Sequence, residues 1–395
     1  MSYFSYLSDE QKQRIFYLPP CEGPLNADKK TLAYALGAVL YMPGIHRKAI
    51  NSIANDQIPG LISTVLCLED AVDDRDVDAA EKNLALQLGK LYSLKEKGSV
   101  LPFIFIRVRD AGQFRRITRQ FGPALDVLTG FVFPKFKAAA GRDYFDHLAE
   151  TNIRLNKTLY GMPILEGPEV MYREFRTEHL LNIKQLLDRY KDIVLNVRIG
   201  ATDLSGLYGL RRSPELTIYD VAVIRDFIAD LVNILGRPGD GYVISGPVWE
   251  YFYSGSRVLK PQLRQTPFQE QFGSDGSKLR QNLLCQYIDG LIREVMLDKA
   301  NGLIGKTIIH PTHLLPVQAL HAVTHEEYCD ARDILASGGS GGVTKSIYNN
   351  KMNEAKPHTN WAERIMTLSK IYGVLNERYD YTSIIYEGEK FQNIG

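Results

Sequence analysis

Apolar runs and amphipathic segments alternate along most of the chain, and eight of the runs have the length of a buried strand. Each run is apolar at most positions, which is typical of a strand buried on both faces of a parallel sheet. The runs occupy residues 35–42, 61–68, 103–108, 130–133, 159–165, 193–199, 241–244 and 307–309. Helical patterns follow them, for example over 76–91 and 172–190. Eight strands alternating with helices predict an α/β fold of the (β/α)₈ type, the TIM barrel.

An open, doubly wound sheet is the structural alternative to this barrel. Such a sheet would carry a glycine-rich turn after its first strand. The segment at that place, Met42-Pro43-Gly44-Ile45-His46, is not such a turn. The closed barrel is therefore the favoured fold.

Segments outside the repeating pattern predict additions to the barrel. Residues 1–33 contain several prolines among polar residues and predict an N-terminal extension that packs on the outside. The barrel domain is predicted to span 34–325, with a polar insertion at about 253–278, between the seventh and eighth strands. Residues 326–395 predict a C-terminal helical segment and a tail.

The C-terminal part has its own pattern. Helices are predicted over 325–335 and 360–375, and the glycine-rich run at 337–342 has the composition of a flexible linker. We expect the polar tail from Tyr379 onward to be poorly ordered or to pack on a neighbouring subunit.

Charge and composition exclude several classes of partner. The chain has 47 basic and 46 acidic residues, so it lacks the strongly basic balance of a nucleic-acid or membrane-surface protein. No apolar run has the length of a membrane span, and the first residues lack the pattern of a secretory signal. The four cysteines show no metal-like spacing. These features predict a reduced, cytoplasmic protein without nucleic-acid or membrane partners.

Charged residues gather at the predicted carboxyl ends of the strands, which is the face where barrel active sites form. They are Glu69 and Asp70 after the second strand, Arg107 and Arg109 around the end of the third, Lys135 after the fourth, Glu166 after the fifth, Asp203 after the sixth and His310 at the end of the eighth; Lys306, near the start of the eighth, is grouped with them. The stability of a barrel does not require so many charged residues on one face. Charges brought together shift one another's pKa and are unfavourable unless they are paired or bound to an ion.

These residues predict a metal site with an adjoining anion site. Glu166 and Asp203 would hold a hard divalent cation, above all Mg²⁺, which takes one or two protein carboxylates and keeps several waters. Glu69 and Asp70 would hold those waters, and the Arg107 guanidinium would take a substrate carboxylate bidentately. A salt-bridge network that only stabilises the rim is the alternative.

Arg109 has two open interpretations. It could pair with a phosphate or second carboxylate of a substrate, or it could be a surface cation on the loop that follows the third strand.

Several short motifs, in order along the chain, carry a resemblance to a known family. They are Pro43-Gly44 after the first strand, Leu68-Glu69-Asp70-Ala71-Val72 after the second, Arg107-Val108 in the third, Pro134-Lys135 after the fourth, Glu166 after the fifth, Gly200-Ala201-Thr202-Asp203-Leu204 after the sixth, and Gly305-Lys306-Thr307-Ile308-Ile309-His310-Pro311 around the eighth. In these motifs the chain resembles the HpcH/HpaI aldolase and citrate lyase beta-subunit family of TIM-barrel enzymes.

The resemblance implies a Mg²⁺-dependent carbon–carbon lyase, with Mn²⁺ as a substitute ion. Such an enzyme cleaves or forms a bond next to a carbonyl through a metal-stabilised enolate. The substrate would be a small 2-keto or hydroxy acid or its CoA thioester, and the assembly a homotrimer or hexamer. The resemblance also implies catalytic roles for Glu69, Asp70, Arg107 and Lys135.

The family often has a C-terminal aspartate that reaches a neighbouring subunit's active site. The matching segment here is Met352-Asn353-Glu354, which makes Glu354 the predicted proton carrier. The long insertion, the N-terminal extension and Arg109 differ from the short citrate lyase subunits, so they leave the acyl carrier open. An aldolase acting on a free 2-keto or sugar-like acid is one alternative. A non-catalytic barrel that binds a metabolite is another.

Overall fold

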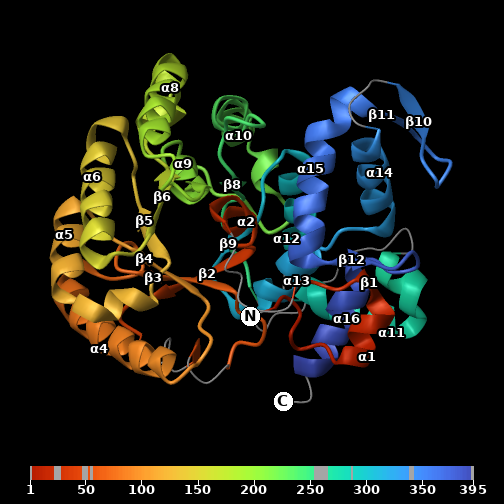
Figure 1. The fold of residues 1–395 in the computed structure, drawn as a ribbon, viewed down its shortest axis with the longest axis horizontal. Coiled ribbons are helices and arrows are strands. Elements are labelled where there is room, and N and C mark those ends of the chain that lie inside the picture. Colours follow the sequence, from red (N-terminus) through yellow and green to blue (C-terminus); the bar gives the residue numbers. More distant parts are fainter. Residues whose placement is uncertain are drawn as a thin grey trace. The chain divides into compact units, whose positions relative to one another are not determined.

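In the computed structural model of the chain, eight parallel strands form one sheet in the order β8-β7-β6-β5-β4-β3-β2-β9 (Figure 1). They are β2 (Ala38–Pro43), β3 (Ser63–Cys67), β4 (Phe103–Arg107), β5 (Gly130–Phe133), β6 (Tyr160–Leu165), β7 (Val197–Ile199), β8 (Ile244–Ser245) and β9 (Lys306–Ile308). A parallel bridge between Gly246 and Lys306 joins the two edges. The sheet therefore closes into a barrel, and the eight strands predicted from the apolar runs are confirmed.

The structure describes residues 2–21, 28–46, 52–53, 57–252, 266–285, 288–337 and 342–392. The chain divides into two compact units. The barrel unit contains Asp28–Tyr251 and Arg293–Leu314, and the second unit contains Met1–Ala27, Phe252–Ile292 and Leu315–Gly395. Among the described residues, no helix combines the length and the apolar character needed to span a membrane.

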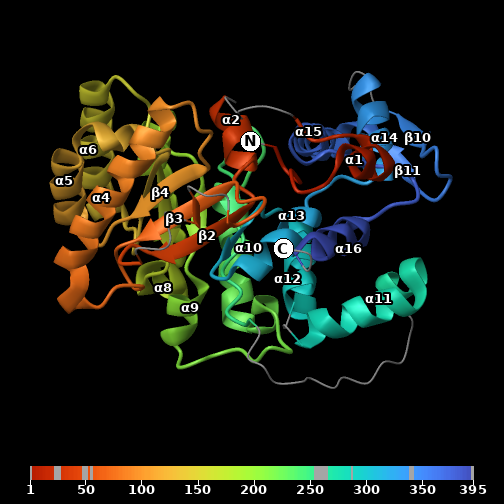
Figure 2. The ribbon, with the colours of Figure 1, turned by 90° about the horizontal axis from the view of Figure 1, so that it is seen from below.

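Helices between the strands cover the outside of the barrel (Figures 1 and 2). The longer ones are α4 (Val77–Glu96), α5 (Ala111–Gln120), α6 (Ala138–Leu155), α8 (Arg173–Arg189) and α10 (Ala222–Leu235), and the short α7 (Pro168–Met171) and α9 (Ala201–Gly206) follow β6 and β7. Helix α5 is representative: the Asp110 carboxylate caps it by accepting from Gln113 N at 2.7 Å, and Phe114 and Ile117 are fully buried.

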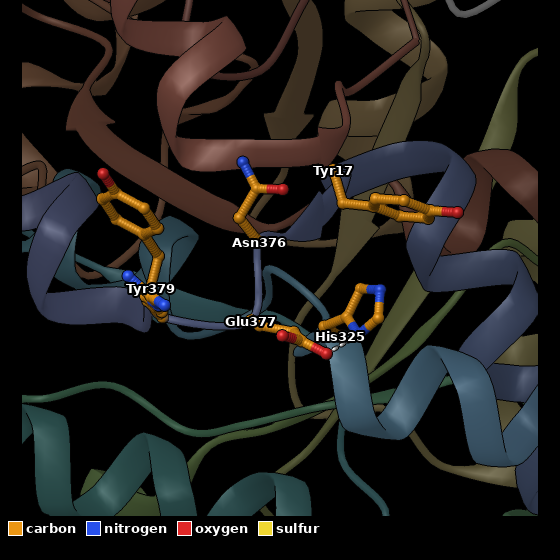
Figure 3. A pocket seen from close by; sticks show the side chains of 6 residues that line it. Tyr17, His325, Asn376, Glu377 and Tyr379 are labelled. Atoms are coloured by element: carbon orange, nitrogen blue, oxygen red, sulfur yellow. Dashed lines mark ion pairs between the residues drawn. The ribbon is translucent and has the colours of Figure 1, made fainter. Parts of the chain in front are cut away.

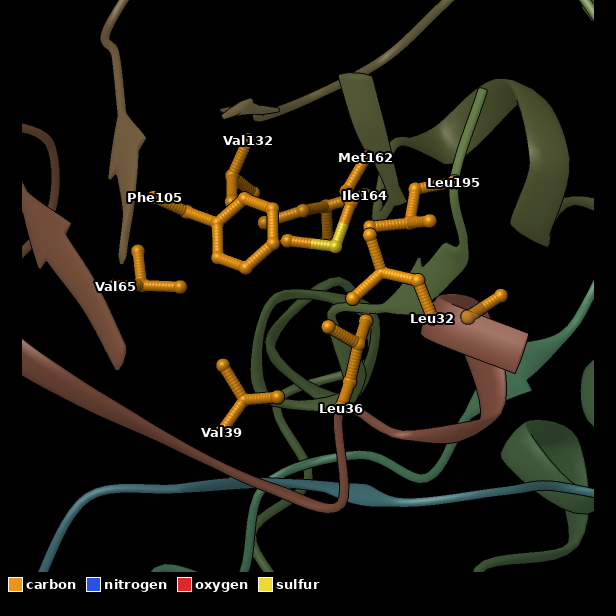
Figure 4. Close-up of a cluster of buried hydrophobic side chains, with 10 residues drawn as sticks. Leu32, Leu36, Val39, Val65, Phe105, Val132, Met162, Ile164 and Leu195 are labelled. Carbon is orange, nitrogen blue, oxygen red and sulfur yellow. The ribbon is translucent and has the colours of Figure 1, made fainter. Parts of the chain in front are cut away.

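A short helix, α2 (Lys29–Tyr34), precedes β2 and fills the end of the barrel at which the strands begin. Its Leu32 and Ala33, with the following Leu36, pack in the core of the barrel (Figure 4). Their partners are inward-facing side chains of the strands and of the segment before β7, namely Val39, Val65, Phe105, Val132, Met162, Ile164 and Leu195. The expectation that residues 1–33 all pack on the outside is therefore wrong for Leu32 and Ala33, because a barrel needs apolar side chains at this end to exclude water.

The second unit is built from segments distant in sequence. Strand β1 (Phe16–Leu18) pairs antiparallel with β12 (Val374–Leu375), and β10 (Val343–Lys345) pairs with β11 (Met352–Glu354). Its main helices are α1 (Asp9–Ile15), α11 (Pro267–Cys285), α14 (His325–Ala336), α15 (Ala355–Tyr372) and α16 (Tyr381–Gln392), while α12 (Ile288–Ala300) and α13 (Leu314–Ala319) each contain residues of both units.

Predictions for the C-terminal part had mixed outcomes. The helix predicted over 325–335 is confirmed as α14, and the one predicted over 360–375 begins earlier, at Ala355. Poor order is wrong for the described part of the tail, through 392, because α16 buries Ile384 and Ile385 completely. Of the predicted insertion, 253–265 lies outside the described residues, and α11 already begins at Pro267. Most of the predicted linker, 338–341, also lies outside them.

Candidate active site

Six charged side chains from the carboxyl ends of β3 to β7 lie together, and we refer to them as the rim cluster. They are Glu69, Asp70, Arg107, Lys135, Glu166 and Asp203. One atom, Arg107 Nη2, lies 2.5 Å from Glu69 Oε2, 2.8 Å from Asp70 Oδ2 and 3.6 Å from Glu166 Oε1. Each charged residue stands at the end of its strand or within four residues beyond it, so the parallel packing of the strands brings these groups to one face.

Two of these carboxylates share a second cation. Lys135 Nζ donates to Glu69 Oε1 at 2.8 Å and lies 3.9 Å from Asp70 Oδ1. Glu69 and Arg107 are buried, whereas Asp70 and Lys135 are exposed. The cluster therefore has a buried floor and an open side through which a ligand could enter.

The backbone around Glu166 is adapted to its side chain. Lys135 has a φ of 47°, a left-handed conformation that is uncommon for a residue with a side chain. In this conformation its N–H donates to Glu166 Oε1 at 2.7 Å. On the other side, a Cβ atom on Gly200 would lie 2.1 Å from Glu166 Oε2, so only glycine leaves room for the carboxylate.

The electrostatics of the cluster favour a bound cation. Burial, with the charge of Asp203 adding to it, raises the pKa of Glu166 to about 7, against the opposing effect of Arg107. Burial and the charge of Asp70 likewise raise the pKa of Asp203. Four carboxylates face only two cations, and a divalent cation would remove the excess of negative charge.

Glu166 and Asp203 are the two carboxylates that could hold such an ion. Among the described residues, no three or more His, Cys, Asp or Glu side chains form a site that could hold a metal ion. Two oxygen ligands with waters in the remaining positions is nonetheless the arrangement Mg²⁺ commonly takes. The donor set fits a hard cation. The alternative of a purely structural network is less favourable, because it leaves the buried Glu166 with a raised pKa.

Other predicted residues have different environments. Arg109 pairs with Asp74 at 2.6 Å, as expected for the surface-cation interpretation. Lys306 does not join the rim cluster, because it is fully buried at the start of β9 and donates to Glu294 and Asp298 of α12 at 2.9 and 2.7 Å.

Two further predicted residues lie away from the cluster. His310 accepts from Thr312 N at 3.3 Å and caps the single turn that follows. Glu354 lies in the second unit at the end of β11, where its backbone N–H donates to His358 Nδ1 at 3.1 Å. Its role as a proton carrier stays a prediction.

The prediction from the strand ends missed Arg198, a buried charged residue that lies within β7. It is a register neighbour of Ile164, which belongs to the inward-facing core. A signal was present in the sequence: Asn196 and Arg198 alternate with apolar residues, so the strand presents two polar side chains on one face.

Two pockets lie outside the cluster. In the barrel unit, Thr202, Arg211 and Glu250 line a pocket beside α9, the helix that also carries Asp203. In the second unit, Tyr17, His325 and Glu377 line another pocket, with His325 Nδ1 3.9 Å from the Glu377 carboxylate (Figure 3). None of the residues predicted to act in the site lines this second pocket.

Comparisons with known proteins agree with this fold. Residues 30–374 match the model of the C-C bond lyase family of the TIM-barrel fold. No relative matches among the curated proteins. Protein CitE from Mycobacterium tuberculosis, in complex with magnesium, acetoacetate and coenzyme A, is 17% identical, with a TM-score of 0.51 over 85% of this chain and 99% of that one.

Two other solved structures are more distant in shape. The citrate lyase beta subunit from M. tuberculosis, complexed with oxaloacetate and magnesium, is 17% identical over 73% of this chain and 97% of that one, with a TM-score of 0.43. The magnesium/glyoxylate complex of Haloferax volcanii malate synthase is 11% identical over 71% and 73%, with a TM-score of 0.49. The family model covers most of the chain, including every strand of the barrel. The chain therefore belongs to the carbon–carbon bond lyases of the TIM-barrel fold and is an enzyme of that class.

Proposed function

We propose that the enzyme is a Mg²⁺-dependent lyase that cleaves or forms a carbon–carbon bond next to the carbonyl of a small 2-keto or hydroxy acid. The observation that carries the proposal is the rim cluster, in which four carboxylates meet two cations and the pKa of Glu166 rises to about 7. An excess of oxygen donors at the mouth of a barrel suits an ion and an anionic substrate together. The ligands of the CitE complex, magnesium and acetoacetate with coenzyme A, are the first class to test.

Each residue has a proposed task. Glu166 and Asp203 would hold the ion, and Glu69 and Asp70 would orient its waters. Once bound, the ion would supply a Lewis acid that polarises the carbonyl oxygen beside the bond to be broken. Burial keeps solvent away from Arg107, so its charge acts strongly on nearby anions.

The two cations would bind and stabilise the substrate. The guanidinium of Arg107 would take the substrate carboxylate, and with Lys135 it would offset the negative charge that develops on the enolate. The hydrogen bond to Glu69 raises the pKa of Lys135, so the amine stays protonated while it does so. We further propose that Glu354 carries the proton, supplied by a neighbouring subunit of a trimer or hexamer.

Titration calorimetry with Mg²⁺ and Mn²⁺ tests the metal site directly. Wild type should bind one ion per chain, and Glu166→Gln and Asp203→Asn should each weaken binding at least about 10-fold. Glu169→Gln is the matched control, because this carboxylate lies nearby on α7 but pairs with Lys137 outside the cluster. Equal binding by wild type, Glu166→Gln and the control would contradict the proposal.

A product assay then tests the reaction. The metal-loaded enzyme is incubated with candidate 2-keto and hydroxy acids and with their CoA thioesters, and the released keto acid is measured. Competition by an acyl-CoA would favour the thioester as substrate. If added acyl-CoA does not change the rate at which the free acid is turned over, an aldolase acting on a free acid is favoured.

A further inference from the structure

A second buried arginine, Arg198, extends from β7 into the interior of the barrel. Arg198 of β7 is 1% exposed. Its Nη2 donates to Thr307 Oγ1 of β9 at 2.6 Å, and its Cζ lies 5.7 Å from the centroid of the Tyr41 ring on β2. In the sheet, β8 separates β7 from β9, and β2 lies beyond β9. The side chain therefore crosses the barrel interior rather than pairing with a neighbouring strand.

No carboxylate of the described residues pairs with this guanidinium. Two of its nitrogens, Nε and Nη1, are buried and find no hydrogen-bond partner in the part of the chain that the structure describes. The other buried arginines among the described residues each pair with an acid: Arg107 with Glu69, Arg176 with Asp230, and Arg212 with Glu294. A buried charge without a counter-ion is strongly unfavourable. Arg198 is thus the exception in this part of the chain, and an anion from outside would relieve it.

The position of Arg198 connects it to the rim cluster. Its register neighbour Ile164 lies two residues before Glu166 on β6. Tyr41 lies within electrostatic reach of both arginines: burial raises the pKa of its phenol, and the charges of Arg198 and Arg107 oppose that rise. Arg198 therefore lies just inside the barrel from the place where the substrate carboxylate would bind.

We propose that Arg198 binds a second anionic group of the substrate, so that the preferred substrate carries two: one held at Arg107, and a distal carboxylate or phosphate held at Arg198. The inference rests on the proposed function for the first of these groups. Tyr41, whose side chain is only partly buried, is expected to move aside when the second group enters. Burial would then exclude water from the contact and strengthen it.

Calorimetry on the Mg²⁺-loaded enzyme measures this second contact. Pyruvate carries one carboxylate, oxaloacetate two, and phosphonopyruvate a carboxylate and a phosphonate. Wild type should bind at least one of the two dianions about 10- to 100-fold more tightly than pyruvate, as a charge-assisted hydrogen bond allows. Arg198→Met should abolish that preference and change the Kd for pyruvate less than about twofold. Which dianion gains identifies the distal group as a carboxylate or a phosphate.

A thermal-denaturation series distinguishes this role from a structural one. Without ligand, Arg198→Met should melt at the same temperature as wild type or higher, because it removes an unpaired buried charge. Arg176→Met is the matched control: it breaks a buried pair with Asp230 and should lower the Tm. If Arg198→Met does not fold, Arg198→Lys decides, since it keeps the charge but loses the planar geometry and should lose most of the preference.

Each outcome decides between the alternatives. The proposal is overturned if Arg198→Met still binds oxaloacetate or phosphonopyruvate more tightly than pyruvate. It is also overturned if wild type binds pyruvate but binds neither of the other two acids more tightly. If no 2-keto acid binds at all, the proposed function fails, and inorganic phosphate becomes the probe. A phosphate-induced rise in Tm that wild type shows and Arg198→Met lacks would still support the anion site, and no rise in wild type would refute it.

Discussion

Replacing Glu166 with glutamine should stabilise the metal-free protein at alkaline pH while it weakens metal binding. The reason is the pKa of this carboxyl, which rises from 4.5 to about 7 in the folded protein through burial and the charge of Asp203. The folded state therefore holds its proton more tightly than the unfolded chain does. Between these two pKa values the folded state binds more protons, so its stability falls as the pH rises.

The size of the effect follows from the same shift. The full difference corresponds to roughly 3 kcal/mol in the free energy of unfolding, at about 1.4 kcal/mol for each pH unit. Coupling to Asp203 shares part of this, so we expect about 1–3 kcal/mol. Glutamine cannot ionise, yet its carbonyl can still accept the hydrogen bond from Lys135 N. The substitution should therefore raise the free energy of unfolding at pH 8 and have little effect at pH 5.

Urea denaturation at pH 5, 6, 7 and 8, with and without Mg²⁺, is the assay. Without metal, the free energy of unfolding of wild type should fall from pH 5 to pH 8 relative to that of Glu166→Gln. Mg²⁺ should raise the free energy of unfolding again in wild type only. The control Glu169→Gln removes a partly buried carboxylate paired with Lys137 outside the cluster and should not reproduce this pattern. Parallel stability curves for wild type and Glu166→Gln across this range would refute the reasoning.

Three other substitutions test the neighbourhood of the cluster. Gly200→Ala places a Cβ 2.1 Å from Glu166 Oε2, so it should lower the free energy of unfolding by about 1–3 kcal/mol, lower the Tm and weaken Mg²⁺ binding. The control Gly206→Ala, with open space around it, should change neither the Tm nor the Mg²⁺ affinity. Equal effects of the two substitutions in melting and calorimetry would contradict the steric argument. Lys135→Met removes a cation that offsets substrate charge, so kcat/KM should fall about 10- to 100-fold while Mg²⁺ affinity stays equal or rises; unchanged kinetics would exclude this role. Arg109→Ala should leave kcat/KM within about twofold, since this arginine pairs with Asp74 at the surface, and a large loss would reinstate its role as an anion-binding residue.

The strands of the barrel could be predicted from sequence because they are buried on both faces. Such strands appear as mainly apolar runs, and at several of them a charged residue at or just past the end of the run marks the carboxyl end of the strand. The same rule explains why the sequence alone predicts Glu69, Glu166 and Asp203 at one rim. Their catalytic and metal-binding roles stay predictions.

What sequence patterns missed depends on distant contacts. The tail from Tyr379 looks polar, but Gln11 and Arg14 of α1 bond to Glu387 of α16, which no local pattern indicates. Arg198 interrupts an apolar run, and only the closed barrel reveals that it reaches Thr307. Lys306 is grouped with the rim charges from sequence, but it begins β9 and pairs with Glu294 and Asp298 of α12. The strand pattern gives no indication of contacts with that helix.

The pairing of β1 with β12 has a consequence for the order in which the protein is made. On a ribosome the first 27 residues emerge early, but β1 must wait for residues 374–375 before it can pair. The barrel needs β9, at 306–308, to close its sheet, so it becomes complete while most of the second unit's C-terminal helices are still untranslated. Tyr3, whose ring packs against Tyr372 of α15 in the folded protein, lacks that partner throughout this interval. We therefore expect a chain that stops before α15 to leave Tyr3 and β1 without their C-terminal contacts, which favours aggregation.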